Sequence, residues 1–101
     1  MTEISDDGRF EWDSEKRKTN IQKHGIDFIK ILPAFDDPHF IERFDYKHSI
    51  EEERYFGLGM IGVVLIFAIS YTEDKRIRII SARLANKKEE NIYDEHIKRI
   101  Y

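Results

Sequence analysis

The sequence contains no cysteine, which excludes disulfide scaffolds, cysteine nucleophiles and thiolate metal sites and favours a cytoplasmic location. It also lacks a long apolar run: Met60–Ile69 is about half the length that a transmembrane helix requires. The first residues, Met1–Gly8, are acidic and polar, so we expect them to form a flexible tail and not a secretory signal. These absences predict a soluble protein.

Motifs for metal or phosphate binding are missing as well. The four histidines have no ligand-like spacing with each other or with nearby acids, and no glycine-rich loop could hold a phosphate. Asp36 and Asp37 precede a proline, which is typical of a turn, although two adjacent acids also suggest a magnesium site. We therefore expect no metal and no cofactor.

The composition predicts one folded domain over residues 9–101, because 41% of the residues are hydrophobic and 13% are aromatic. A net charge of −3 argues against non-specific binding of nucleic acid. However, basic residues gather in the segments 16–23 and 76–88. The acidic total can therefore hide a basic cleft.

Capping and breaking residues predict three helices. Asp13 is a good N-cap for a helix over Ser14–His24, which Gly25 would end. A shorter second helix follows and should be kinked or ended by Pro33. A charged pattern with an apolar stripe predicts a last helix over Asn86–Tyr101.

Strand patterns occur in five segments: Arg9–Trp12, His39–Phe44, Arg54–Met60, Val63–Tyr71 and Lys75–Ala82. Short connections between the last three favour antiparallel hairpins. The apolar run Val63–Ile69 predicts a central strand that is covered on both faces. The element order predicts an α+β fold, with two N-terminal helices and one C-terminal helix against a twisted antiparallel sheet. This sheet would be a meander of three to four strands plus a short N-terminal strand.

Arginines occupy both expected faces of the last strand. With a period of two, Arg83 points to one face, and Arg76 and Arg78 point to the other. Burying an unpaired guanidinium is costly. Each arginine should therefore pair with a carboxylate or reach an open site where it grips an anion such as phosphate.

Three sequence blocks together resemble the BrnT toxins from about residue 9 to residue 93. They are Phe10–Asp13 with Lys16, Asn20 and Lys23–Gly25; Phe28 with Phe35–Pro38; and Arg54, Gly57 or Gly59, Ile77–Arg83, Ala85, Glu89 and Tyr93. The resemblance implies a RelE-like fold and a metal-independent endoribonuclease that inhibits translation. It further implies a ribbon-helix-helix antitoxin of the BrnA type, expected in a heterotetramer that contacts operator DNA only through the antitoxin.

Metal-free RNA cleavage uses the 2′-hydroxyl of the substrate as nucleophile, so the protein supplies a proton acceptor, a proton donor and positive charge for the phosphate. Arg83 is the first candidate for a phosphate clamp, and an ion pair with Glu89 is the alternative. Arg54 has the same two interpretations. Arg78 is expected in a structural ion pair, although it could also contact RNA.

The remaining candidates also have two interpretations. His24 could act as an acid or base, or only contact the last helix carbonyls. Lys16 and Lys23 could follow an RNA backbone or form a solvated helix face. Glu89 could be a general base, and Tyr93 could stack on a base, donate a proton or belong to the core.

A second function stays open at this point. The chain could be a weak or inactive toxin-like protein that binds its antitoxin and acts only in operon repression. The distribution of charge discriminates between the two functions: cations that converge on one concave surface favour catalysis, and interleaved acids favour a binding module.

Overall fold

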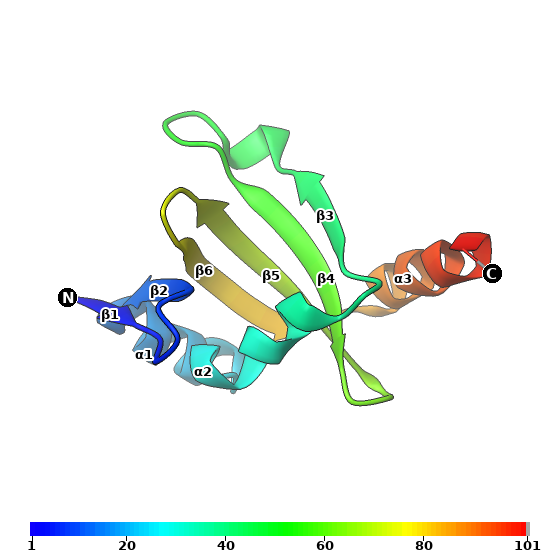
Figure 1. Ribbon diagram of the computed structural model, residues 1–101, viewed down its shortest axis with the longest axis horizontal. Helices are drawn as coiled ribbons and strands as arrows, with labels where there is room; N and C mark the ends of the chain where they lie inside the picture. The colour runs from blue at the N-terminus through cyan, green and yellow to red at the C-terminus, as the bar shows by residue number, and fades with distance from the viewer. Residues whose placement is uncertain (101) are drawn as a thin grey trace.

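A computed structural model describes residues 1–100, which form a six-stranded sheet with helices packed on it (Figure 1). The strand order is β1-β2-β6-β5-β4-β3. The strands are β1 (Thr2–Ile4), β2 (Phe10–Asp13), β3 (Ile41–Phe44), β4 (Tyr55–Ile61), β5 (Leu65–Glu73) and β6 (Ile77–Leu84). The helices are α1 (Ser14–His24), α2 (Phe28–Ile31) and α3 (Lys87–Ile100), with the 3-10 turns η1 (Leu32–Asp36) and η2 (Tyr46–His48).

The sheet is mixed, and the expected purely antiparallel sheet is wrong at the pairing of β2 with β6. The strands β3, β4, β5 and β6 pair antiparallel in chain order. In contrast, β2 runs parallel to β6, with Phe10 opposite Ile77 and Trp12 opposite Ile79. Parallel neighbours need a long connection, and here most of the chain lies between the two strands.

The segment Met1–Gly8, which the sequence predicts to be a flexible tail, contains a short strand in the structure. Thr2–Ile4 forms β1, which pairs antiparallel with β2. The Trp12 indole N–H donates to Glu3 (Nε1–Oε1 2.7 Å), and the terminal amino group contacts Asp13 (N–Oδ1 3.2 Å). The chain reverses through a turn in which Gly8 has a φ of 73°, a conformation that glycine adopts easily.

The first helix ends as its capping residues predict. Asp13 accepts a hydrogen bond from the backbone N–H of Lys16 (Oδ2–N 3.1 Å), and Gly25 ends α1 with a φ of 70°. The second helix is a single turn, and Pro33 continues the chain into η1 and not into a longer α-helix.

One face of the sheet packs on an aromatic core. Phe10 and Trp12 from β2, Phe28 from α2, and Ile69 and Tyr71 from β5 are all at most 2% exposed. Glycine at position 59 of β4 allows η1 to approach, since a Cβ there would lie 2.5 Å from the backbone oxygen of Ala34.

The helix α3 packs on the opposite face around Tyr93, together with Leu58, Ile66 and Ala68. Ile66–Ile69 is buried on both sides, so the middle of β5 is doubly covered as the apolar run predicts. The start of the predicted run is wrong, since Val63, Val64 and Leu65 are exposed and β5 begins at Leu65. Tyr101, the last residue of the expected helix, lies outside the described residues. No helix within residues 1–100 is long and apolar enough to cross a membrane.

The buried side chain of Asn20 joins α1 to the open edge of β6. Its amide donates to the carbonyl of Ala82 (Nδ2–O 2.7 Å) and accepts from the Ala82 N–H (Oδ1–N 3.0 Å). It also donates to the carbonyl of Ile26 (2.9 Å). The pairing of β2 with β6 ends at Ile79, before Ala82, so Asn20 replaces the strand partner that Ala82 lacks on this side.

We predict that Asn20→Ala lowers the free energy of unfolding by about 1–3 kcal/mol, because buried backbone groups of Ala82 lose their partner. Urea titration followed by circular dichroism measures this change. Gln22→Ala, at an exposed position of the same helix, is the control and should have little effect. Equal stability of the two variants would contradict the edge role of Asn20.

Candidate functional site

A bulge in β6 places Arg78 and Arg83 on the same face of the sheet. Strict alternation predicts opposite faces. In the structure the register with β5 skips Ile80, so Arg78 lies opposite Thr72 and Arg83 lies opposite Ala68. Since β5 alternates regularly between these partners, both arginines project from the face that α3 covers at one end. The predicted separation of the two arginines is therefore wrong.

The alternation of β3 and of β4, extended by one residue to Arg54, assigns two more arginines to this face. Arg43 in β3 lies opposite Phe56 in β4, which in turn lies opposite Ser70 in β5. Arg54 precedes β4 and has the same alternation as Phe56. We call the four residues the arginine face: Arg43, Arg54, Arg78 and Arg83.

Arg83 and Glu89 form a two-pronged ion pair at the junction of β6 and α3. Arg83 donates through both terminal nitrogens (Nη1–Oε1 2.6 Å, Nη2–Oε2 2.9 Å). Glu89 also accepts from the backbone N–H of Asn86 (2.9 Å), and Asn86 Oδ1 accepts from the Glu89 N–H (2.9 Å), which caps α3. The hydrogen bond from Arg83 outweighs partial burial and lowers the pKa of Glu89.

Arg78 pairs with Glu11, its neighbour across the parallel strand β2. This is the structural ion pair that the sequence predicts for Arg78. Arg76, at the start of the strand, also approaches Glu11 (Nη1–Oε1 3.9 Å) and donates to the carbonyl of Gly8 (Nε–O 3.0 Å). Both arginines therefore help to hold the N-terminal hairpin on β6.

Arg54 lines a separate groove on the β4 side of the sheet. The groove is formed by Lys47, His48, Ile50, Glu51, Glu52 and Arg54. The Nε atom of Arg54 is buried and has no hydrogen-bond partner among the described residues. The structure therefore does not place Arg54 in one pocket with Arg83.

His24, Lys16 and Lys23 meet in a groove of about 250 Å³ between α1 and β6. Ile80 and Ser81, the residues at the bulge, form its other wall. Ser81 lies opposite Ser70, so this groove opens beside the face that carries Arg83. The predicted histidine and lysines are thus brought together near the strand that carries the predicted clamp.

Tyr93 is 1% exposed, and its hydroxyl donates to Asp37. It therefore belongs to the core, and the structure does not support the predicted contact with RNA. Asp37 also accepts from the backbone N–H groups of Met60 (2.8 Å) and His39 (2.8 Å). Burial alone would raise the pKa of Asp37, but these hydrogen bonds lower it.

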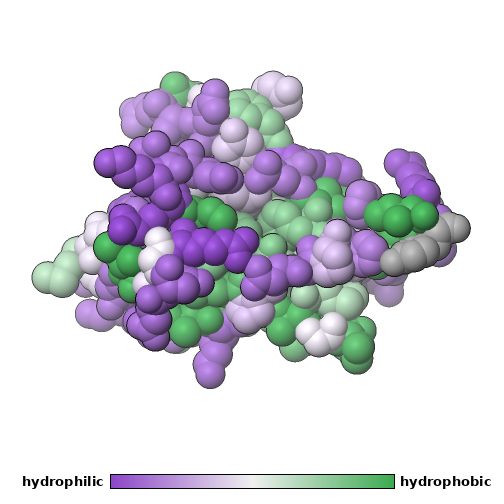
Figure 2. Space-filling view, in the orientation of Figure 1, coloured by the Kyte–Doolittle hydropathy of each residue, from purple (hydrophilic) through white to green (hydrophobic). Residues whose placement is uncertain are grey.

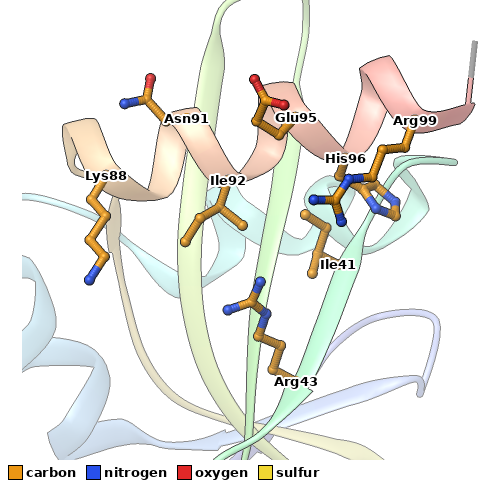
Figure 3. A pocket seen from close by; sticks show the side chains of 8 residues that line it. All are labelled: Ile41, Arg43, Lys88, Asn91, Ile92, Glu95, His96 and Arg99. Carbon is orange, nitrogen blue, oxygen red and sulfur yellow. The ribbon is translucent and has the colours of Figure 1, made fainter.

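A further groove contains cations that the sequence analysis does not name as candidate site residues. It lies between β3 and the outer side of α3, as Figure 3 shows, and it encloses about 370 Å³. Its lining consists of Ile41, Arg43, Lys88, Asn91, Ile92, Glu95, His96 and Arg99. The helical spacing of residues 88, 92, 95 and 99 was a usable signal, but the sequence does not show that they face Arg43. Within residues 1–100 no group of three metal-ligating side chains occurs.

We predict that Glu89→Gln lowers stability at neutral pH and that the difference from the unaltered chain shrinks in acid. The folded-state pKa of Glu89 lies below its usual 4.5, so its contribution is present above that value and is lost as the pH falls through the folded pKa. Urea unfolding at a series of pH values measures the difference. Glu90→Gln is the control, since no ion pair engages Glu90 in the described part of the chain. A pH-independent difference would contradict the pairing.

Comparisons with known proteins agree on one family. A family model described as the ribonuclease toxin BrnT of type II toxin-antitoxin systems matches residues 12–89. The crystal structure of the Brucella abortus ribonuclease toxin BrnT is similar with a TM-score of 0.57 and 26% sequence identity, over 75% of this chain and 94% of that chain. No curated protein matches.

Proposed function

The chain belongs to the BrnT family of ribonuclease toxins of type II toxin–antitoxin systems, and we propose that it is a metal-independent endoribonuclease with a RelE-like arrangement. In this proposal it cleaves RNA in the cytoplasm and thereby inhibits translation. The observation that carries the proposal is the arginine face, where the bulge of β6 aligns Arg78 and Arg83 beside the groove of His24, Lys16 and Lys23. A surface of this kind suits a phosphodiester.

Arg83 fits the role of phosphate clamp because it is fixed and remains accessible. Its side chain is 38% exposed, whereas its partner Glu89 is 13% exposed. Glu89 restricts the guanidinium to one orientation, so little conformational freedom is lost when a phosphate binds. The nitrogen atoms used by Glu89 must then be shared with the phosphate or released to it.

Glu89 is better suited to positioning Arg83 than to accepting a proton. Three hydrogen bonds stabilise its ionised form and lower its pKa, which makes the carboxylate a weak base near neutral pH. His24 is exposed at the end of α1 in a groove with two lysines, so we assign it the acid or base role. Lys16 and Lys23 would then contact phosphates on either side of the cleaved bond.

One observation favours the second candidate, an inactive toxin-like protein that acts only in repression. Arg78 and Arg83 already hold carboxylate partners, Glu11 and Glu89, so acids interleave the cations on part of this face. If these two ion pairs never dissociate, Arg78 and Arg83 cannot bind a phosphate. Direct measurement of RNA cleavage decides between the two functions.

We predict that Arg83→Ala lowers the rate of RNA cleavage by about 10²–10³-fold, since the charge that develops on the phosphate loses its stabilisation. Arg83→Lys should recover only part of the rate because lysine lacks the planar fork. Glu89→Gln should retain much more activity than Arg83→Ala if Glu89 only positions the arginine. Cleavage of a labelled RNA, with circular dichroism to verify folding, measures these rates.

Arg9→Ala is the matched control, because it breaks the exposed pair of Arg9 with Asp36 (2.6 Å) away from the arginine face. It should cleave as the unaltered chain does, and cleavage should persist in the presence of a chelator. Loss of cleavage on chelation would refute the metal-free mechanism. Intact RNA with the unaltered chain would refute the enzyme proposal and leave the repression role.

A type II toxin implies an antitoxin partner, and we propose a ribbon-helix-helix antitoxin of the BrnA type in a heterotetramer that reaches operator DNA only through the antitoxin. Exposed aliphatic side chains at the β4–β5 turn supply a candidate contact surface (Figure 2). Val63 is 87% exposed and Val64 is 72% exposed. Leu84, which is also half exposed, follows Arg83 directly, so a partner bound here would lie beside the clamp.

We predict that Val63→Ser/Val64→Ser weakens binding of the cognate antitoxin by at least about tenfold, because apolar area no longer leaves water on binding. Isothermal titration calorimetry measures the affinity, and RNA cleavage by the free variant should be unchanged. Ile50→Ser, which alters another exposed aliphatic residue outside this turn, is the control. Unchanged affinity would place the antitoxin elsewhere.

A further inference from the structure

In the part of the chain that the structure describes, the ion pairs leave a specific set of arginines unpaired. The chain has eight arginines. Five of them pair with carboxylates: Arg9, Arg17, Arg76, Arg78 and Arg83. Within residues 1–100, Arg43, Arg54 and Arg99 form no ion pair. Two of these three, Arg43 and Arg99, line the groove between β3 and α3.

Cations enter this groove from both of its walls. Figure 3 shows the Arg43 side chain extending from β3 toward α3, while the side chains of Lys88 and Arg99 extend from α3 on the same side of the helix. His96 lies next to Arg99. A basic stripe on a single helix is usually a solvated face, but that explanation does not account for an arginine on the facing strand.

The acid of the groove does not neutralise these cations. Glu95 points away from Arg43 in Figure 3, and it pairs with Lys98 one turn further along the helix (Oε1–Nζ 3.6 Å). In a chain with a net charge of −3, acids were available to pair with Arg43 and Arg99, yet none lies within ion-pair distance among the described residues. Like charges left together disfavour the folded state, and a bound polyanion offsets this cost.

One end of the groove adjoins the turn of α3 that holds the proposed clamp. Lys88 directly precedes Glu89, whose carboxylate holds Arg83. Arg43 projects from the same sheet face as Arg83. A strand of RNA with its reacting phosphate at Arg83 would therefore pass Lys88 and continue along α3 toward Arg99.

We propose that the groove between β3 and α3 is a second RNA-binding site, in which Arg43, Lys88 and Arg99 hold backbone phosphates remote from the bond that is cleaved. This proposal rests on the proposed function, since it takes the polyanion to be the RNA substrate. The site reads no bases and adds affinity for long RNA. A dinucleotide is too short to reach it.

The salt dependence of RNA binding tests this site. The slope of log K against log salt counts phosphate contacts, so it would not change if Arg43 and Arg99 only stabilised the fold. The probe is a 2′-O-methyl RNA oligonucleotide, which lacks the proposed nucleophile, followed by fluorescence anisotropy between about 50 and 200 mM salt. Arg43→Gln/Arg99→Gln should reduce the slope of log K against log salt by about 1.4, because each phosphate contact on a single strand contributes about 0.7. The free energy of unfolding of the Arg43→Gln/Arg99→Gln variant should not fall.

Lys18→Gln/Lys30→Gln is the control with the same change in net charge. Both lysines are exposed and lie on α1 and α2, away from the groove. This control should leave the slope unchanged. In cleavage assays, Arg43→Gln/Arg99→Gln should raise KM for long RNA more than it raises KM for a dinucleotide.

The outcomes separate this proposal from the proposed function. Absence of cleavage by the unaltered chain refutes the ribonuclease mechanism, whereas an altered salt slope in Arg43→Gln/Arg99→Gln still supports the groove. Equal slopes for this variant and its control overturn the groove even if cleavage is normal. Loss of antitoxin binding with an unchanged RNA slope also overturns it, since the groove would then belong to the protein partner.

Discussion

The extra residue in β6 is the constraint on which the candidate site depends. Without the bulge at Ile80, Arg83 would point into the aromatic core beneath α2, where an arginine would be buried without a partner. With the bulge, the residues of β6 after Ile80 point to the opposite faces from those that strict alternation predicts. Ala82 then enters the core and Arg83 reaches the face that meets α3.

Two neighbours hold this local geometry in place. On one side β5 pairs with β6 on both sides of the bulge. On the other side Asn20 satisfies the N–H and carbonyl of Ala82, where β2 no longer does so. Because Asn20 belongs to the same helix as Lys16 and Lys23, the bond that fixes the strand also fixes the position of the neighbouring basic groove.

The arrangement of charge explains how an acidic chain can present a basic surface. Carboxylates hold the arginines that shape the fold, as in the pairs Arg17 with Asp27 and Arg78 with Glu11. Within residues 1–100, Arg43 and Arg99 have no such partner, and they meet across one groove. Net charge therefore says little about the local potential, because it does not distinguish cations that are neutralised from cations that are available.

Local signals in the sequence determined the elements and the family. The caps at Asp13 and Gly25 determined the first helix, and the apolar run before Ser70 determined the central strand, because these signals act through neighbouring residues. Only the tertiary structure decided the parallel pairing of β2 with β6, the burial of Tyr93 and the side of the sheet that Arg83 occupies. A bulge, a strand partner and a facing helix depend on residues far apart in the chain, so no local pattern specifies them.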